Sequence, residues 1–188
     1  MNSTVILIGP IGAGKTTVGR LLAQKLGVGF CSVDDVRKGY YGELGYDMDL
    51  ASKIGASREG IRGALRYAEA FDARMVERVL ADYGGGVIDF GASNSVYDDK
   101  GLLVRVEEVL RPFPNVVLLL PSADTAESNR ILRERLIGML TAAGRGFSEE
   151  LFELNRYFIE HRSNWLLAKR VVFTEGKTIG EICDEAGA

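Results

Sequence analysis

A glycine-rich segment near the start of the chain constrains the fold more than any other stretch of the sequence. Residues 9–17 read GPIGAGKTT, directly after an apolar run at residues 5–8 and directly before an amphipathic helical pattern. Strand, glycine loop and helix follow in that order, and every required position of G-x-x-x-x-G-K-[ST] is filled, which predicts a phosphate-binding loop. A glycine-rich turn without any ligand is the alternative, and it leaves the complete pattern unexplained.

The residue types in this loop suit a nucleoside triphosphate. Glycines allow backbone N–H groups to approach phosphate oxygens, and the helix that follows directs the positive end of its dipole at the same place. Lys15 can reach the β- and γ-phosphates, and the Thr16 hydroxyl can ligate Mg²⁺. We therefore expect ATP and Mg²⁺ as cofactors, with the nucleotide held by Gly9, Gly12, Ala13, Gly14, Lys15, Thr16 and Thr17.

Length and composition favour one soluble domain. The chain has 188 residues, 46% of them hydrophobic, which suffices for a buried core. A net charge of −3 argues against binding to nucleic acid or to an anionic membrane surface. Because we find no secretion signal and no apolar segment of membrane-spanning length, we expect a cytoplasmic protein in which Cys31 and Cys183 are reduced.

Apolar runs alternate with helical patterns along the whole chain. Strands are predicted at residues 5–8, 28–31, 87–90, 116–120 and 171–173. This alternation predicts a three-layer α/β fold of the P-loop NTPase type, with helices on both faces of a five-stranded parallel sheet. We expect a single domain over 1–188 with two insertions: a small glycine- and tyrosine-rich substrate-binding lobe at 35–63 and an arginine-bearing lid at 137–148.

Acidic residues follow two predicted strands, at the edge where open α/β sheets bind ligands. Asp34 comes just after the second strand and could meet a substrate hydroxyl or Mg²⁺; capping of the next helix is the alternative. Asp89 ends the third strand and could hold Mg²⁺ through water. The small polar loop that starts at Gly91 lies at the same edge.

Arginines gather after the fourth predicted strand. Sixteen residues contain Arg130, Arg133, Arg135 and Arg145. A solvated basic helix face accounts for most of them, whereas the flexible stretch around Arg145 favours that residue as a lid arginine that stabilises a transferring phosphoryl group. The lone histidine, His161, is more typical of a surface or capping residue than of a catalyst.

The layout resembles the shikimate kinase family of small P-loop kinases, which have a nucleoside monophosphate kinase-like fold. The segment from Gly9 to Ala23 is similar to the opening of that family almost residue for residue. The second strand of the family usually ends in Asp-x-Asp, where the second acid meets the acceptor hydroxyl. Asp34 matches this second acid, while Ser32 replaces the first, so Asp35 or Asp89 would hold the Mg²⁺ waters instead.

The resemblance also implies contacts to the acceptor and to adenine. The segment around Arg66, LRYAE, is similar to the family's phenylalanine-arginine-x-x-glutamate segment, and the segment at Arg162 is a looser version of its arginine-x-proline-x-tyrosine segment. In the family both arginines clamp the carboxylate of the acceptor. The adenine would lie between Arg130 and the turn at Lys177. Two family features are missing: only Gly91 remains of three glycines, and the lid lacks arginine-proline-leucine.

Together these features predict an ATP-dependent kinase that transfers the γ-phosphate to a hydroxyl of a small anionic or polyhydroxylated metabolite. The expected catalytic residues are Lys15, Asp34 and Arg145. Acceptor contacts are expected from Asp34, Arg66, Gly91 and Arg162, and Mg²⁺ contacts from Thr16, Asp34 and Asp89. The alternatives are a nucleoside, nucleotide, sugar acid or antibiotic as acceptor, or a non-enzymatic nucleotide-dependent switch. We expect no nucleic-acid or membrane partner, and a monomer or weak homodimer.

Overall fold

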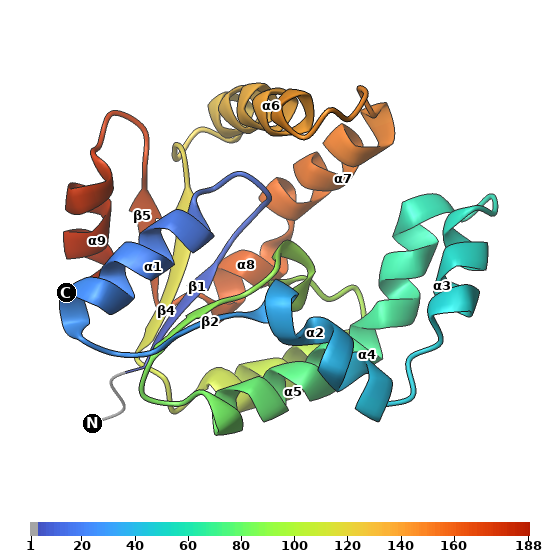
Figure 1. Cartoon of the computed structure of the whole chain (residues 1–188), viewed down its shortest axis with the longest axis horizontal. Helices are drawn as coiled ribbons and strands as arrows, with labels where there is room; N and C mark the ends of the chain where they lie inside the picture. Colours follow the sequence, from blue (N-terminus) through green and yellow to red (C-terminus); the bar gives the residue numbers. More distant parts are fainter. Residues whose placement is uncertain (1–3) are drawn as a thin grey trace.

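The computed structural model describes residues 4–188, which form three layers around a central sheet (Figure 1). Over these residues the sheet has five strands, all parallel, in the order β2-β3-β1-β4-β5. The strands are β1 (Val5–Ile8), β2 (Phe30–Ser32), β3 (Val87–Asp89), β4 (Asn115–Leu120) and β5 (Arg170–Phe173). The predicted α/β fold with a five-stranded parallel sheet is therefore confirmed.

One face of the sheet is covered by α1 (Lys15–Leu26) and α9 (Ile179–Gly187). Leu22 and Cys183 from these helices share a buried apolar cluster with strand residues. The helix α1 ends at Gly27, whose φ of 67° lies in the left-handed region that glycine adopts without strain. The helix predicted after the glycine loop is therefore present as α1.

The other face carries the larger apolar cluster of the molecule. It is covered by α2 (Val33–Glu43), α4 (Gly60–Asp82), α5 (Lys100–Leu110) and α8 (Arg162–Leu167). Every residue of β1 and β4 except Asn115 is buried, as expected for strands covered on both sides. Burial on both faces leaves only the strand ends free to present polar groups.

Three further helices within residues 4–188 lie outside the two layers that cover the sheet. Two of them, α6 (Thr125–Ala142) and α7 (Glu149–Glu160), lie next to each other beside the loop, and α3 (Met48–Gly55) packs on the first half of α4 in a projecting lobe at the right of Figure 1. Asp124 and Ser148 cap the starts of α6 and α7 with their side-chain oxygens.

The predicted substrate-binding lobe at residues 35–63 is more helical than its glycines indicate. Glycine is typical of loops, but α2 runs through Gly39 and Gly42. A helical glycine costs about 1 kcal/mol relative to alanine. Packing offsets this cost, because Tyr40 and Tyr41 are buried and their rings and hydroxyls contact α4. The limits proposed for the lobe and the lid stay predictions.

Two of the expectations from composition concern the cysteines and segments that could cross a membrane. Cys31 and Cys183 are both buried free thiols, and burial raises the pKa of Cys31 to about 11. A thiol with such a pKa is poorly reactive at neutral pH. Across residues 4–188 we find no helix that combines the length and the apolar character needed to cross a membrane.

Candidate active site

The loop between β1 and α1 depends on glycine at three positions. Gly9 has a φ of 137°, and a Cβ at this position would lie 2.6 Å from the Leu119 carbonyl oxygen. Gly12 and Gly14 have φ values of 80° and 94°. L-residues with a side chain rarely adopt such angles, so the conformation of the loop explains the glycine spacing seen in the sequence.

Lys15 lies folded over this loop. Its Nζ donates hydrogen bonds to the carbonyl oxygens of Gly9, at 2.9 Å, and of Pro10, at 3.0 Å. Burial lowers the pKa of the Lys15 amine, whereas the nearby carboxylates of Asp89 and Asp34 oppose that shift. Two neutral carbonyls and partial charge compensation leave a buried ammonium group that an anionic ligand would stabilise further.

Thr16 and Asp89 meet beside Lys15. The Thr16 hydroxyl donates to Asp89 Oδ2 at 2.5 Å, although the two residues are 73 positions apart in the chain. Burial raises the pKa of Asp89, and the charge of Lys15 and the Thr16 hydrogen bond act against this shift. Asp35, the other candidate for the Mg²⁺ waters, instead faces Arg20 at 3.9 Å and is largely exposed.

The Thr16–Asp89 pair has the right chemistry for Mg²⁺ in the presence of a nucleotide. Mg²⁺ prefers oxygen ligands and is usually held by one or two carboxylates together with waters and phosphate oxygens. Among residues 4–188, no group of three His, Cys, Asp or Glu side chains is arranged to hold a metal ion. The donor set therefore fits an ion that arrives with a triphosphate rather than a metal site built by the protein alone.

Asp34 lies at the same edge of the sheet because of the strand register. Ser32, the last residue of β2, is aligned with Asp89 at the end of β3, and Asp34 follows in the first turn of α2. The negative charge of Asp34 acts on both Lys15 and Asp89. Asp34 does not cap α2, since the N-cap position is Ser32 and no side chain caps this helix. The sequence residues Lys15, Thr16, Asp34 and Asp89 are thus brought together.

Gly91 borders Asp34, and a side chain at this position would displace the Asp34 carboxylate and Arg37. A Cβ on Gly91 would lie 2.5 Å from Asp34 Oδ1 and 2.6 Å from a terminal nitrogen of Arg37. The φ of Gly91 is −57°, an angle open to any residue, so only neighbouring side chains restrict the position. A short 3₁₀ helix, η1 (Ala92–Ser95), follows directly and presents polar side chains to α2.

The sequence did not point to Arg37, which lies at the centre of these polar groups. Its Nη2 lies 3.2 Å from Asp34 Oδ1 and donates to Ser93 Oγ at 3.2 Å and Asn94 Oδ1 at 3.0 Å. Asp72 from α4 lies behind this group and is 2% exposed. The one available sequence signal for this group was the position of Asp72 among apolar residues at helical spacing, since a buried carboxylate needs polar partners.

Two further residues near the loop were also missed. Arg135 on α6 donates from Nη1 to the Gly12 carbonyl oxygen at 3.2 Å, and both line an open pocket along the loop. Asn155 on α7 forms hydrogen bonds with both backbone polar groups of Ile11: its Oδ1 accepts from Ile11 N at 2.8 Å, and its Nδ2 donates to Ile11 O at 3.0 Å. The cluster of arginines was a signal for Arg135; Asn155 had none.

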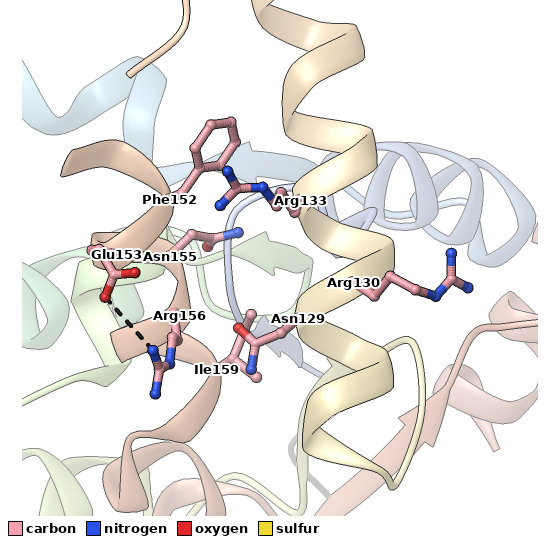
Figure 2. A pocket seen from close by; sticks show the side chains of 8 residues that line it. All are labelled: Asn129, Arg130, Arg133, Phe152, Glu153, Asn155, Arg156 and Ile159. Atoms are coloured by element: carbon pink, nitrogen blue, oxygen red, sulfur yellow. Dashed lines mark ion pairs between the residues drawn. The ribbon is translucent and has the colours of Figure 1, made fainter. Parts of the chain in front are cut away.

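A second pocket lies between α6 and α7 and ends against Asn155 (Figure 2). Asn129 and Ile159 also line it, while the side chain of Arg130 points away from its centre (Figure 2). Arg130 is engaged on the surface of α6 by ion pairs of 2.6 Å with Glu127 and 2.8 Å with Glu134. An adenine contact by Arg130 would require it to exchange these partners.

The other arginine and lysine candidates lie outside the group formed by the loop and Asp34. Arg66 pairs with Glu59 at 2.9 Å, and Lys177 pairs with Glu185 at 2.7 Å. Arg145 and Arg162 are exposed, and neither side chain forms a hydrogen bond or ion pair with any residue of 4–188. His161 caps α8 by accepting from Ser163 N at 3.3 Å, as its capping interpretation predicts.

The fold and this edge of the sheet define a P-loop phosphotransferase. Comparison with known proteins gives the same class. A family model described as shikimate kinase matches residues 11–43. A shikimate kinase of Streptomyces coelicolor is 29% identical over 187 residues, which cover 97% of this chain and 92% of that protein. A shikimate kinase of Francisella tularensis subsp. holarctica is 33% identical over 110 residues, and this match spans 58% of that protein's length and 56% of this chain.

Solved structures of the same class share the fold. A shikimate kinase from Acinetobacter baumannii in complex with shikimate has a TM-score of 0.62 and 20% identity, with 98% of this chain and 90% of that chain covered. A gluconokinase from Sinorhizobium meliloti 1021 has a TM-score of 0.56 and 17% identity, with 98% and 89% covered. The family-model match and the curated relatives bear out the resemblance to the shikimate kinase family inferred from the sequence, and the solved structures bear out the fold.

Proposed function

We propose that this chain is an ATP- and Mg²⁺-dependent kinase that transfers the γ-phosphate of ATP to a hydroxyl group of a small metabolite. The observation that carries this proposal is the meeting of Lys15, Asp89 and Asp34 at the end of the parallel sheet. A nucleotide-dependent switch needs the loop and the Mg²⁺ ligands. A switch has no need for an exposed carboxylate such as Asp34 beside the loop, whereas a kinase can use this carboxylate to accept the proton of the acceptor hydroxyl.

The donor half of the site would consist of the glycine loop with Thr16, Thr17 and Asp89. Lys15 would exchange its two carbonyl partners for β- and γ-phosphate oxygens. Mg²⁺, when bound, would neutralise charge on those oxygens, with Thr16 and Asp89 in its coordination sphere or bonded to its waters. Arg135 already reaches the loop and can approach the phosphates. Arg145 stays the proposed lid arginine, since the stretch that carries it follows α6 directly.

Asp34 would act on the acceptor. Its carboxylate is 64% exposed at the edge of the site, so a bound hydroxyl can reach it. As the acceptor oxygen bonds to the γ-phosphorus and the bond to ADP breaks, the hydroxyl proton would pass to Asp34. Asp34 could also bind a Mg²⁺ water, as predicted from the sequence. Gly91 would allow the acceptor to approach the backbone beside this carboxylate.

The acceptor we propose is a polyhydroxylated or anionic metabolite. The similar proteins named above include shikimate kinases and a gluconokinase, which are named for hydroxylated acids. Arg66 and Arg162 would bind a carboxylate of such an acceptor; Arg162 is free to do so, and Arg66 would have to leave Glu59. A nucleoside, nucleotide or antibiotic is the alternative acceptor. Adenine would lie between Arg130 and Lys177, and we propose a cytoplasmic monomer or weak homodimer.

A panel assay tests this function. Purified protein would be incubated with Mg²⁺ and ATP and with hydroxylated acids, sugars, nucleosides and antibiotics, and ADP release would be recorded for each. We expect acceptor-dependent ADP release with at least one class, and a loss of about 100-fold or more in Asp34→Asn. Tight ATP binding without release in the presence of any acceptor would instead support the switch.

A further inference from the structure

The guanidinium group of Arg37 links polar side chains that follow two neighbouring strands. It forms an ion pair with Asp34, which follows β2, and it donates hydrogen bonds to the side chains of Ser93 and Asn94, which follow β3. We propose that Arg37 is a positioning residue that holds the Asp34 carboxylate in the orientation in which it accepts the acceptor proton. This inference rests on the proposed kinase function and assigns to Arg37 a role through Asp34, without contact to the phosphates.

Asp34 needs such a partner because little else restrains it. Its side chain is 64% exposed, and no hydrogen bond or ion pair other than that with Arg37 is formed by this carboxylate within residues 4–188. An exposed carboxylate without a partner exchanges among rotamers, whereas catalysis requires the reacting oxygen to be held close to one geometry. The contact at 3.2 Å to Oδ1 supplies that restraint.

Arg37 is itself fixed more firmly than the carboxylate that it holds. Ser93 and Asn94 accept hydrogen bonds from its Nη2, and the ring of Tyr41 lies 5.8 Å from its guanidinium carbon. Only 28% of the Arg37 side chain is exposed. All three contacts are made by Nη2, and a planar guanidinium group fixed by two hydrogen bonds keeps this nitrogen in place beside Asp34, which a flexible lysine ammonium group does not.

The buried carboxylate of Asp72 stabilises the positions of two side chains that contact Arg37. It accepts hydrogen bonds from the Tyr41 hydroxyl at 2.7 Å and from Asn94 Nδ2 at 2.8 Å. Burial raises the pKa of Asp72, and the positive charge of Arg37 is the largest influence in the opposite direction. Asn94 therefore connects Asp72 to Arg37, and these side chains form a continuous polar group beneath Asp34.

The hydrogen bonding of Arg37 indicates that this group is kept for function and not for stability. Arg37 Nε is buried without a hydrogen-bond partner among residues 4–188, a condition that is unfavourable for folding. Unsatisfied donors of this kind tend to persist where a site requires them. Gly91 adds space for the Asp34–Arg37 contact, since a Cβ there would lie within 2.6 Å of the ends of both side chains and would displace them.

The test compares kinetics of Arg37→Gln with those of Asp34→Asn, both measured with the acceptor identified in the panel assay. We expect Arg37→Gln to lower kcat by about 10- to 100-fold, while KM for ATP changes by less than about twofold, because only the acceptor side is disturbed. Adding Arg37→Gln to Asp34→Asn should lower kcat no further, since Arg37 acts through Asp34.

Control variants separate positioning from folding. Arg37→Gln leaves Asp72 without its charge partner, so the same comparison is made in an Asp72→Asn background, with melting temperatures recorded. Arg78→Gln is the matched control, because Arg78 also joins α2 and α4 through an ion pair with Glu43, at 2.6 Å, and a ring contact with Tyr40, away from Asp34. Arg78→Gln should leave kcat unchanged. Arg37→Lys should recover only part of the lost kcat, because a compact ammonium group on a flexible chain is held less firmly at the position of Nη2 than a planar guanidinium group.

Two results would overturn the role of Arg37 while leaving the kinase function intact. One is a wild-type kcat in folded Arg37→Gln. The other is a full additional loss when Arg37→Gln is combined with Asp34→Asn, which would mean that Arg37 acts independently of Asp34. If the wild-type protein transfers phosphate to no acceptor, the proposed function itself fails, and the two failures are therefore distinguishable.

Discussion

Asp89 is a residue whose position favours ligand binding at the expense of folding. It is 4% exposed, and burial raises the pKa of its carboxyl group despite the charge of Lys15 and the hydrogen bond from Thr16. A neutral side chain of the same shape would avoid the cost of burying a charge. Proteins retain such groups at sites where a ligand provides the missing compensation, and in the proposed function that ligand is Mg²⁺ with a nucleotide.

Replacement of Asp89 by Asn should therefore stabilise the free protein and abolish its activity. We expect the melting temperature at pH 7 to rise by about 2–4 °C, the change that ~1 kcal/mol produces in a domain of this size. We also expect Mg²⁺-dependent ADP release to fall by about 100-fold or more, because the carboxylate is lost. Thermal unfolding and the panel assay measure the two effects.

The pH dependence of this stabilisation has a defined sign. Since the pKa of Asp89 is raised in the folded protein, folding favours the protonated carboxyl group, and wild-type stability decreases as the pH rises through that pKa. The advantage of Asp89→Asn should be largest at neutral pH and shrink as the pH falls below the folded pKa. A gain that stays constant from pH 7 to pH 4 would contradict a charged, buried Asp89.

At this scale the sequence predicts residues that belong to local patterns and misses those that depend on distant contacts. Lys15 and Thr16 follow from a motif, and Asp34 from its place after a strand. Arg37 becomes significant only through Ser93, 56 positions away, and Arg135 only through Gly12, 123 positions away. No spacing in the sequence encodes these contacts, because they arise when α2, η1 and α6 meet at one edge of the sheet.

Among the elements, α7 has a role that its apolar pattern does not reveal. One side of this helix packs through Leu154 and Phe158 in a small apolar cluster, and on another side Asn155 reaches the phosphate loop. Because Asn155 forms hydrogen bonds with both the N–H and the C=O of Ile11, α7 fixes the loop in one conformation. Nucleotide affinity should then depend on a helix more than a hundred residues away in the chain.

Replacement of Asn155 by Ala tests this dependence. Loss of the two hydrogen bonds would release the loop, and we expect the Kd for ATP to rise by about tenfold, equivalent to ~1.4 kcal/mol. Isothermal titration calorimetry with ATP measures the change. Asn129→Ala is the control, because Asn129 lines the same pocket from α6 (Figure 2) but, among residues 4–188, its side chain bonds only Thr125 and Glu160. Equal affinities for both variants would contradict an anchoring role for α7.

The elements themselves were predicted to different degrees. The five strand positions follow from apolar runs because buried parallel strands need little else to be recognised. The helices α2 and α3 were obscured by glycines, whose low helix propensity is overridden by the aromatic contacts among Tyr41, Tyr46 and Phe71. Such tertiary contacts cannot be read from the local sequence. The glycine content therefore indicated a loop-rich lobe where the structure has helices.

In the whole molecule, the lobe formed by α3 and the first half of α4 is joined to α7 across the acceptor side of the site. Glu150 on α7 accepts a hydrogen bond from the Ile61 backbone N–H at 2.8 Å and so caps the start of α4 from another element. Arg62 stacks on Tyr157 of α7, with its guanidinium carbon 3.3 Å from the ring centroid. The two parts that would enclose an acceptor are therefore in contact.

Glu150→Ala should loosen this junction. We expect a loss of about 0.5–1 kcal/mol in the free energy of unfolding, typical of a removed helix cap, together with a higher KM for the acceptor and an unchanged KM for ATP. Chemical denaturation and steady-state kinetics check both effects. Glu153→Ala is the control on the same helix, since the one interaction of the Glu153 side chain within the described part of the chain is an exposed ion pair of 3.8 Å with Arg156. Unaltered stability and unaltered acceptor KM in Glu150→Ala would show that the junction contributes nothing.

The central claim is that the site transfers phosphate from ATP to a carbon-bound hydroxyl. ³¹P NMR tests it most directly, because the spectrum distinguishes the γ-phosphate, inorganic phosphate and a phosphate monoester in one sample. With Mg²⁺, ATP and the acceptor from the panel, we predict that the γ-phosphate signal is replaced by a monoester signal of equal intensity, and that Asp34→Asn slows this replacement by about 100-fold or more. Conversion of ATP to inorganic phosphate alone, with no monoester from any acceptor, would contradict the account.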